Sequence, residues 1–184
     1  RRDLNKRYVL IIDEINRGNL PRIFGELLYL LEYRDETEPV VLPYSNKRFT
    51  IPENVYMIGT MNTADRSIAI VDHALRRRFH FFSFKPDPQI LLSWLRDQGK
   101  ETMAWVADLL QELNDRLSRD QIDWHLHIGH SHWMVPDGQL DDRRARLIWD
   151  YSIRPTLEEY FYKSSDRLAH YDYDELKSIV TDER

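Results

Sequence analysis

Two adjacent carboxylates follow an apolar run near the start of the chain, which reads YVLIIDEINRGNLP from Tyr8 to Pro21. The residues from Val9 to Ile12 are β-branched except for Leu10, which predicts a strand buried on both faces in a parallel sheet. In open α/β sheets, ligands bind at the carboxyl ends of such strands. There Asp13 could hold Mg²⁺ and Glu14 could activate a water molecule as general base. Taken alone, the dipeptide is a weak signal, because it also suits a solvated turn or a helix cap.

Two further polar features follow in order along the chain. Val55–Thr60 is a second apolar run, and it places Asn62 at the tip of a neighbouring strand, where an amide could orient the same water or a γ-phosphate. The segment ALRRRF then ends a predicted helix in Arg76–Arg78. These arginines either complement the helix dipole or supply an arginine finger to a neighbouring subunit's γ-phosphate. The order of the three features is more specific than any one of them and indicates the Walker B side of a P-loop nucleotide hydrolase.

The elements that must position these residues fall into two regions that meet at Pro86. The first region, 1–85, is α/β: apolar runs, helical spacing and turn residues predict strands, helices and one hairpin. Its expected elements are a strand at 9–12, a helix over 20–31 that begins after Asn19, a hairpin over 40–51, a strand at 55–60, a helix ending at Arg78 and a strand at 79–84.

The second region, 86–184, is all-helical. Its expected elements are helices over 87–98 and 101–120, an irregular stretch over 122–136, a long helix over about 140–162 bent at Pro155, and a short helix over about 173–180. All five tryptophans of the chain fall in this region, which favours a role in its core.

The composition limits the classes of protein that the chain can belong to. It has 184 residues, 42% of them apolar, and a net charge of −5, which is no electrostatic footprint for wrapping nucleic acid. It contains no cysteine, so disulfides and thiolate metal sites are excluded. No apolar window is long enough to span a membrane. These features predict a soluble, cytoplasmic protein without a membrane partner.

Histidines gather in the segment HLHIGHSH, residues 125–132. Three of them, His125, His127 and His130, lack the spacing of a helical zinc motif, and the sequence has no H-E-x-x-H. A contact on the nucleotide side of the helical region is therefore favoured over a metal cluster.

Several blocks together resemble one family. IIDEINRGNLPRIFGELLYLLE, VLPYS, YMIGTMNTADRS and VDHALRRRF, with IGHSHW and RPTLEEYF further on, are similar to the motor domain of McrB-like AAA+ proteins. The resemblance covers nearly the whole chain from Tyr8. It implies the C-terminal portion of an AAA+ P-loop NTPase domain, a parallel sheet with a hairpin insert, followed by an all-helical lid over 86–184.

The resemblance also implies roles for particular residues. Asp13 and Glu14 match the Walker B pair, with Asp13 on the metal, and Asn62 matches sensor 1 and opens the NTAD block that ends at Asp65, a cofactor-binding residue. Arg77 and Arg78 match the arginine-finger region, and Arg76 is the weaker candidate. The hairpin matches an insert before sensor 1. In the lid, His130 and Ser131 would approach the nucleotide.

For the whole protein, the resemblance implies GTP hydrolysis with Mg²⁺, and ATP is the alternative. Hydrolysis would occur between subunits of a ring, expected to be a hexamer, and would drive DNA translocation with a McrC-like nuclease subunit for restriction of modified DNA.

One expected motif is missing. The sequence has no G-x-x-x-x-G-K-[ST], and its one Gly-Lys pair, Gly99–Lys100, precedes Glu101. The phosphate cradle and its lysine are thus absent. The chain is therefore expected to be part of a longer motor and to be inactive in hydrolysis by itself. Two alternatives stay open: a non-catalytic AAA+-derived interaction module, and a related AAA+ ATPase of another defence or remodelling system.

Overall fold

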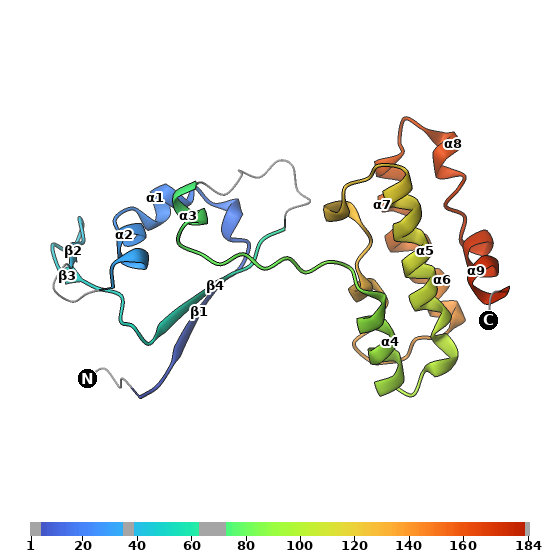
Figure 1. Cartoon of the computed structure of the whole chain (residues 1–184), viewed down its shortest axis with the longest axis horizontal. Coiled ribbons are helices and arrows are strands. Elements are labelled where there is room, and N and C mark those ends of the chain that lie inside the picture. Colours follow the sequence, from blue (N-terminus) through green and yellow to red (C-terminus); the bar gives the residue numbers. More distant parts are fainter. Residues whose placement is uncertain (1–4, 35–38, 63–72, 183–184) are drawn as a thin grey trace. The chain divides into compact units, whose positions relative to one another are not determined.

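The two strands expected to carry the acidic and amide residues pair in parallel (Figure 1). A computed structural model describes residues 5–34, 39–62 and 73–182. Strand β1 (Tyr8–Ile12) pairs with β4 (Val55–Gly59) in a register that places Tyr8 opposite Val55 and Ile12 opposite Gly59. The carboxyl ends of both strands therefore lie at one edge of the sheet, as the sequence predicts.

The burial predicted for these strands is wrong in the described structure. Val9 is 55% exposed, Ile11 66% and Ile58 52%. The reason is physical: the described part of the sheet has two strands, and the apolar cluster beside it is small, with Phe24 and Leu75 buried at its centre. Six apolar side chains of the two strands therefore stay 48–66% exposed: Tyr8, Val9, Leu10, Ile11, Tyr56 and Ile58.

The helix expected over 20–31 is two helices, α1 (Leu20–Phe24) and α2 (Leu27–Glu32). Its predicted start is confirmed, because the Asn19 side chain accepts a hydrogen bond from the Arg22 main-chain N–H at 3.1 Å. The break falls at Gly25, whose φ of +45° lies in the left-handed region that glycine adopts at little cost. Helical spacing of the apolar residues continues across the break and conceals it.

The remaining elements of the first unit are short. The hairpin is confirmed: β2 (Val40–Val41) and β3 (Arg48–Phe49) pair antiparallel. A 3₁₀ turn, η1 (Ile15–Arg17), follows β1. Helix α3 (His73–Arg76) ends directly before Arg77 and Arg78. The strand expected at 79–84 is absent from the described structure, because no described strand lies beside that segment to complete a backbone ladder.

The chain divides into two compact units, Arg1–Ser83 and Phe84–Arg184. The second is all-helical, as predicted. Its elements are α4 (Pro88–Asp97), η2 (Glu101–Met103), α5 (Trp105–Arg119), η3 (Trp124–Leu126), η4 (His130–His132), α6 (Asp142–Ile148), η5 (Trp149–Ile153), α7 (Arg154–Tyr160), α8 (Ser165–Leu168) and α9 (Tyr173–Asp182). Among the described residues, no helix is both long and apolar enough to cross a membrane.

The long helix expected over about 140–162 runs from α6 through η5 into α7. The helix is irregular over η5, before Pro155, because η5 is a π-helical turn. Proline cannot donate the helical hydrogen bond, and its ring crowds the carbonyl of the preceding turn. A wider π turn directly before Pro155 accommodates that ring, so the helix continues.

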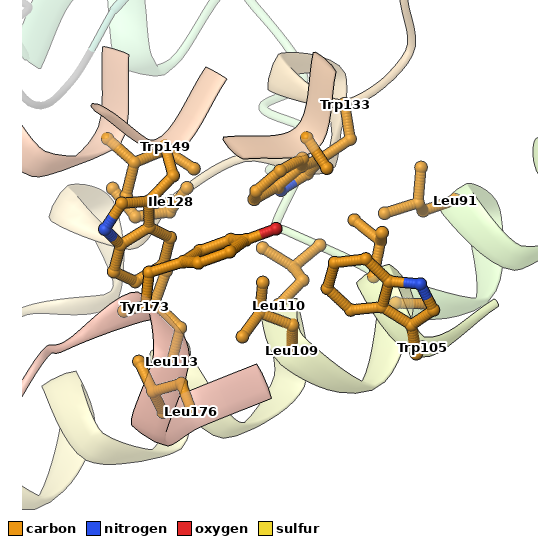
Figure 2. Close-up of a cluster of buried hydrophobic side chains, with 14 of the residues drawn as sticks. Leu91, Trp105, Leu109, Leu110, Leu113, Ile128, Trp133, Trp149, Tyr173 and Leu176 are labelled. Carbon is orange, nitrogen blue, oxygen red and sulfur yellow. The ribbon is translucent and has the colours of Figure 1, made fainter. Parts of the chain in front are cut away.

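The core of the second unit contains large aromatic side chains (Figure 2). Trp133 and Trp149 are at most 1% exposed and Trp105 is 6% exposed, which confirms the predicted role for these three tryptophans. Tyr173 extends across the cluster and packs on the Trp149 ring with centroids 5.4 Å apart. A buried asparagine, Asn114, exchanges two hydrogen bonds of 2.9 and 3.0 Å with the Ile128 backbone and fixes the irregular stretch onto α5.

Two buried tyrosines in this unit predict opposite effects of the same substitution. The Tyr173 hydroxyl has no hydrogen-bond partner in the described structure, whereas the Tyr171 hydroxyl donates to Asp120 at 2.7 Å. Tyr173→Phe should raise the free energy of unfolding by about 1 kcal/mol, because a buried unpaired hydroxyl costs about that much. Tyr171→Phe should lower it by about 1–2 kcal/mol. Urea unfolding at neutral pH measures both, and equal effects of the two variants would contradict the assignment.

The same residue predicts a loss of stability in alkali. Burial, with a smaller effect of Asp142, raises the pKa of Tyr173 to about 12 from its ordinary 10.0. Between these values the unfolded chain loses a proton that the folded chain keeps, so the free energy of unfolding falls as pH rises. The pKa of Tyr171 is raised in the same direction by burial and by its bond to Asp120. Tyr173→Phe should make the decline shallower, and an unchanged slope in urea titrations would count against it.

Candidate active site

The carboxylate pair sits on a sharp turn directly after β1. Asp13 is exposed, and Glu14 is partly buried with φ 51° and ψ 46°, a left-handed backbone. That conformation costs a residue other than glycine about 1–2 kcal/mol. Conformations of this kind persist only where surrounding contacts impose them, and they concentrate at functional sites.

Thr60, which follows β4, makes the contacts that hold this turn. Its main-chain N–H donates to Ile12 O at 3.0 Å, and its carbonyl accepts from Ile15 N–H at 2.8 Å. Its hydroxyl oxygen accepts from Glu14 N–H at 3.1 Å, and the hydroxyl donates to one carboxylate oxygen of Asp13. Every residue from Ile12 to Ile15 is thus bonded to Thr60.

A buried asparagine joins the same turn to the segment that carries Asn62. Asn16 is only 8% exposed, and its Nδ2 donates to the Asn62 carbonyl at 3.1 Å. Its Oδ1 is buried without a hydrogen-bond partner among the described residues. Close packing also marks this place, because a Cβ at Gly59 would lie 2.9 Å from Ile15 Cδ1. Asp13, Glu14 and Asn62 are therefore brought to one edge of the sheet.

Arg17 changes what Glu14 can do in this state. Its Nε lies 3.2 Å from Glu14 Oε2, an ion pair between residues three apart, although that oxygen has no well-directed hydrogen bond. The guanidinium of Arg17 therefore restrains the Glu14 carboxylate in this state.

The helix predicted to end at Arg78 ends at Arg76, and the three arginines of this segment differ in their surroundings. The Arg78 side chain is 15% exposed, and its Nη2 lies 2.9 Å from Glu32 Oε2 on α2. The Arg76 guanidinium lies over the Phe81 ring at 5.8 Å. Arg77 is exposed and makes no ion pair in the part of the chain that the structure describes. Of the predicted finger residues, Arg77 is thus the one for which the described structure shows neither an ion pair nor a ring contact.

The other predicted ligand-binding residues do not lie in this group. Asp65 falls outside the described residues. His130 and Ser131 belong to η4 in the second unit, where His130 Nδ1 accepts from the Asp87 main-chain N–H at 3.1 Å. Because Nδ1 is the acceptor, the neutral ring carries its hydrogen on Nε2, which leaves a donor for a ligand. Ser131 is exposed.

The neighbouring histidines each contact a different serine. His127 Nε2 lies 3.4 Å from Ser118 Oγ, and His132 Nδ1 lies 3.3 Å from Ser152 Oγ. Within the described residues, no three potential ligands gather into a metal cluster. Burial lowers the pKa of His132, so its ring is held in the neutral form.

The carboxylate edge nevertheless fits Mg²⁺ as nucleotide hydrolases use it. That ion is usually held by one or two carboxylates together with waters and substrate phosphates. One Asp13 oxygen is occupied by Thr60, and the other has no hydrogen-bond partner among the described residues, so it can serve as such a ligand.

Two contacts at this edge were not predicted from the sequence, those of Thr60 and Asn16. Thr60 could have been found by extending the parallel pairing one step, since Ile12 opposite Gly59 makes Asp13 the neighbour of Thr60. The burial of Asn16 has no comparable signal, because an asparagine in NRGN reads as an ordinary turn residue.

The chain has an α/β unit with polar groups at the carboxyl edge of its parallel strands, followed by an all-helical unit. This is the domain organisation of an AAA+ domain and its lid. Residues 1–79 match a family model described as AAA domain (dynein-related subfamily). Residues 105–169 match one described as McrB, alpha-helical lid domain.

Two curated relatives agree with these matches. The Type IV methyl-directed restriction enzyme EcoKMcrB subunit of Escherichia coli K12 is 43% identical over 172 residues, which is 85% of this chain and 37% of the relative. The Type II restriction enzyme BsuMI component YdiS of Bacillus subtilis 168 is 28% identical over 129 residues, 60% of this chain and 38% of the relative. The chain thus spans less than half the length of either relative. It belongs to the McrB-like AAA+ proteins.

The environments of the arginines predict different effects on stability. Arg78→Ala should lower the free energy of unfolding by about 1–2 kcal/mol, between the values typical of exposed and of buried ion pairs. Arg77→Ala should change it by less than about 0.5 kcal/mol, as for an ordinary surface substitution. Urea unfolding of the chain measures both, with Glu32→Gln as the partner variant of Arg78. If Arg77→Ala lowers the free energy of unfolding more than Arg78→Ala does, the environments assigned to the two arginines are wrong.

Proposed function

We propose that the chain is the Walker B, sensor and lid portion of a nucleoside triphosphatase motor. Hydrolysis would take place between ring subunits and drive DNA translocation in a restriction system, with GTP as substrate and ATP as the alternative. The observation that carries the proposal is the meeting of Asp13, Glu14 and the Asn62 segment at one edge of a parallel sheet.

Each residue would have a separate role. Asp13 would hold Mg²⁺, which supplies charge neutralisation at the phosphates when bound. Glu14 would accept a proton from the attacking water once Arg17 releases its carboxylate. Asn62 would orient that water or the γ-phosphate. Of the arginines, Arg77 would act as the finger in a neighbouring subunit, because it is exposed and free of ion pairs in the described structure.

Asp65, His130 and Ser131 complete the proposed nucleotide contacts. The Nε2–H of His130 would donate to the nucleotide, since its other ring nitrogen already accepts from Asp87. The phosphate cradle is not in this chain's sequence, so we infer that it comes from residues outside the 184. The exposed apolar side chains of β1 and β4 support the same conclusion, because a sheet of this composition is stable when other elements cover it.

The proposed partners follow from the family and not from a described contact. They are further copies of the chain in a ring, expected to be a hexamer, and a McrC-like nuclease subunit, with DNA reached through the full complex. The E. coli relative's own name, a subunit of a methyl-directed restriction enzyme, supports this assignment.

The test is hydrolysis of GTP and of ATP by the full-length protein and by the 184-residue chain. Glu14→Gln in the full-length protein should lower kcat about 10²–10³-fold, because the general base is lost while the fold is kept. Glu53→Gln, at an exposed position of the same unit, is the matched control and should retain full turnover. The 184-residue chain should show none.

Three outcomes separate the readings. Turnover by the 184-residue chain that Glu14→Gln abolishes would refute the dependence on an outside phosphate loop. A full-length protein without turnover of either nucleotide would favour the non-catalytic interaction module. The KM for GTP and the KM for ATP are measured in the same full-length protein. The nucleotide with the lower KM decides between the McrB-type GTPase and a related ATPase.

A further inference from the structure

We propose that Thr60 is a positioning residue for hydrolysis, whose hydroxyl fixes the Asp13 carboxylate and the Glu14 backbone at the same time. The proposal rests on the proposed function. In the described structure, the Thr60 hydroxyl contacts both members of the carboxylate pair, one through its side chain and the other through its main chain.

The direction of both hydrogen bonds is determined. Glu14 N–H is a main-chain donor, so the Thr60 oxygen must accept from it. A hydroxyl has one hydrogen, and it is then directed to the carboxylate of Asp13, which only accepts when ionised. Serine can reproduce this pair of bonds, whereas valine, which has nearly the same shape, can make neither.

The hydroxyl acts on the conformation that places the Glu14 carboxylate. Glu14 has φ 51°, and its amide N–H is held in that conformation by the Thr60 oxygen. Without this bond, nothing else described contacts the Glu14 N–H, and the residue can relax toward the more common φ below zero. The Glu14 carboxylate would then leave the position that the turn now gives it.

The hydroxyl of Thr60 can be removed without loss of the other contacts that this residue makes. Its bonds to Ile12 O and from Ile15 N–H are main-chain bonds, which any residue at this position keeps. The Thr60 side chain is also exposed, so its replacement leaves no cavity. Thr60→Val therefore removes the two hydroxyl bonds and leaves the strand pairing in place.

The experiment compares Thr60→Val and Thr60→Ser in the full-length protein, with Thr181→Val as matched control. Thr181 is an exposed threonine of α9, in the second unit, whose hydroxyl donates to the Lys177 main-chain carbonyl. We expect Thr60→Val to lower kcat about 10- to 100-fold with the nucleotide KM unchanged, because small displacements of a catalytic group cost that much. The Mg²⁺ concentration for half-maximal turnover should also rise. Thr60→Ser and Thr181→Val should stay within about threefold of the wild type in kcat.

A second measurement does not depend on hydrolysis. Amide hydrogen exchange at Glu14, followed in the full-length protein, should be slow in the wild type and in Thr60→Ser and at least about tenfold faster in Thr60→Val. Wild-type turnover and exchange in Thr60→Val would overturn the proposal. So would equal losses in Thr60→Ser and Thr60→Val, since the methyl group or the shape would then matter and not the hydroxyl.

The two levels of failure are distinguishable. If Thr60→Val accelerates exchange at Glu14 but keeps wild-type kcat, the hydroxyl holds the turn without serving hydrolysis, and only the positioning role fails. If the wild-type full-length protein itself shows no turnover, the proposed function fails and the positioning role fails with it.

Discussion

The site depends on the parallel register of β1 and β4. Ile12 lies opposite Gly59, so the residues that follow the two strands leave the sheet at the same level. A shift by one residue would turn each side chain to the opposite face of the sheet. Asp13 would then face away from Thr60, and the Asn16 bond to the Asn62 carbonyl could not form. Backbone pairing, and not attraction between the polar groups, determines which residues meet.

The turn after β1 combines a cost with several small gains. The left-handed backbone of Glu14 is unfavourable, and each exposed hydrogen bond of the Thr60 hydroxyl contributes about 0.5–1.5 kcal/mol. The balance is close to zero, so these bonds select a geometry more than they stabilise the fold. Arg17 adds an ion pair to Glu14 that would compete with proton abstraction on the proposed function. The described state is thus one in which the carboxylates are ordered and the glutamate is restrained.

Much of this arrangement could be predicted from the sequence, for reasons of pattern. Continuous apolar runs indicated parallel strands, and the rule that such strands share a carboxyl edge brought Asp13 and Asn62 together. Thr60 and Asn16 could not be predicted in the same way, because their roles depend on register and on burial. Gly25 interrupts a helix whose apolar spacing is unbroken. The strand expected at 79–84 fails because a strand needs a neighbour, which a local pattern of aromatic residues does not provide.

The two units bury their apolar side chains to different degrees. The second unit has a core of its own, where Trp133, Leu110 and Ile153 are fully buried. The first leaves Ile11 and Phe82 largely exposed, so its sheet is the part that needs a covering surface. Such a surface is required whether the chain works as a motor part or as an interaction module, and exposure therefore does not distinguish these readings. The Glu14 backbone does favour one of them. The hydrogen bonds of the Thr60 hydroxyl select one conformation of this glutamate, and general-base catalysis needs that carboxylate in a fixed place.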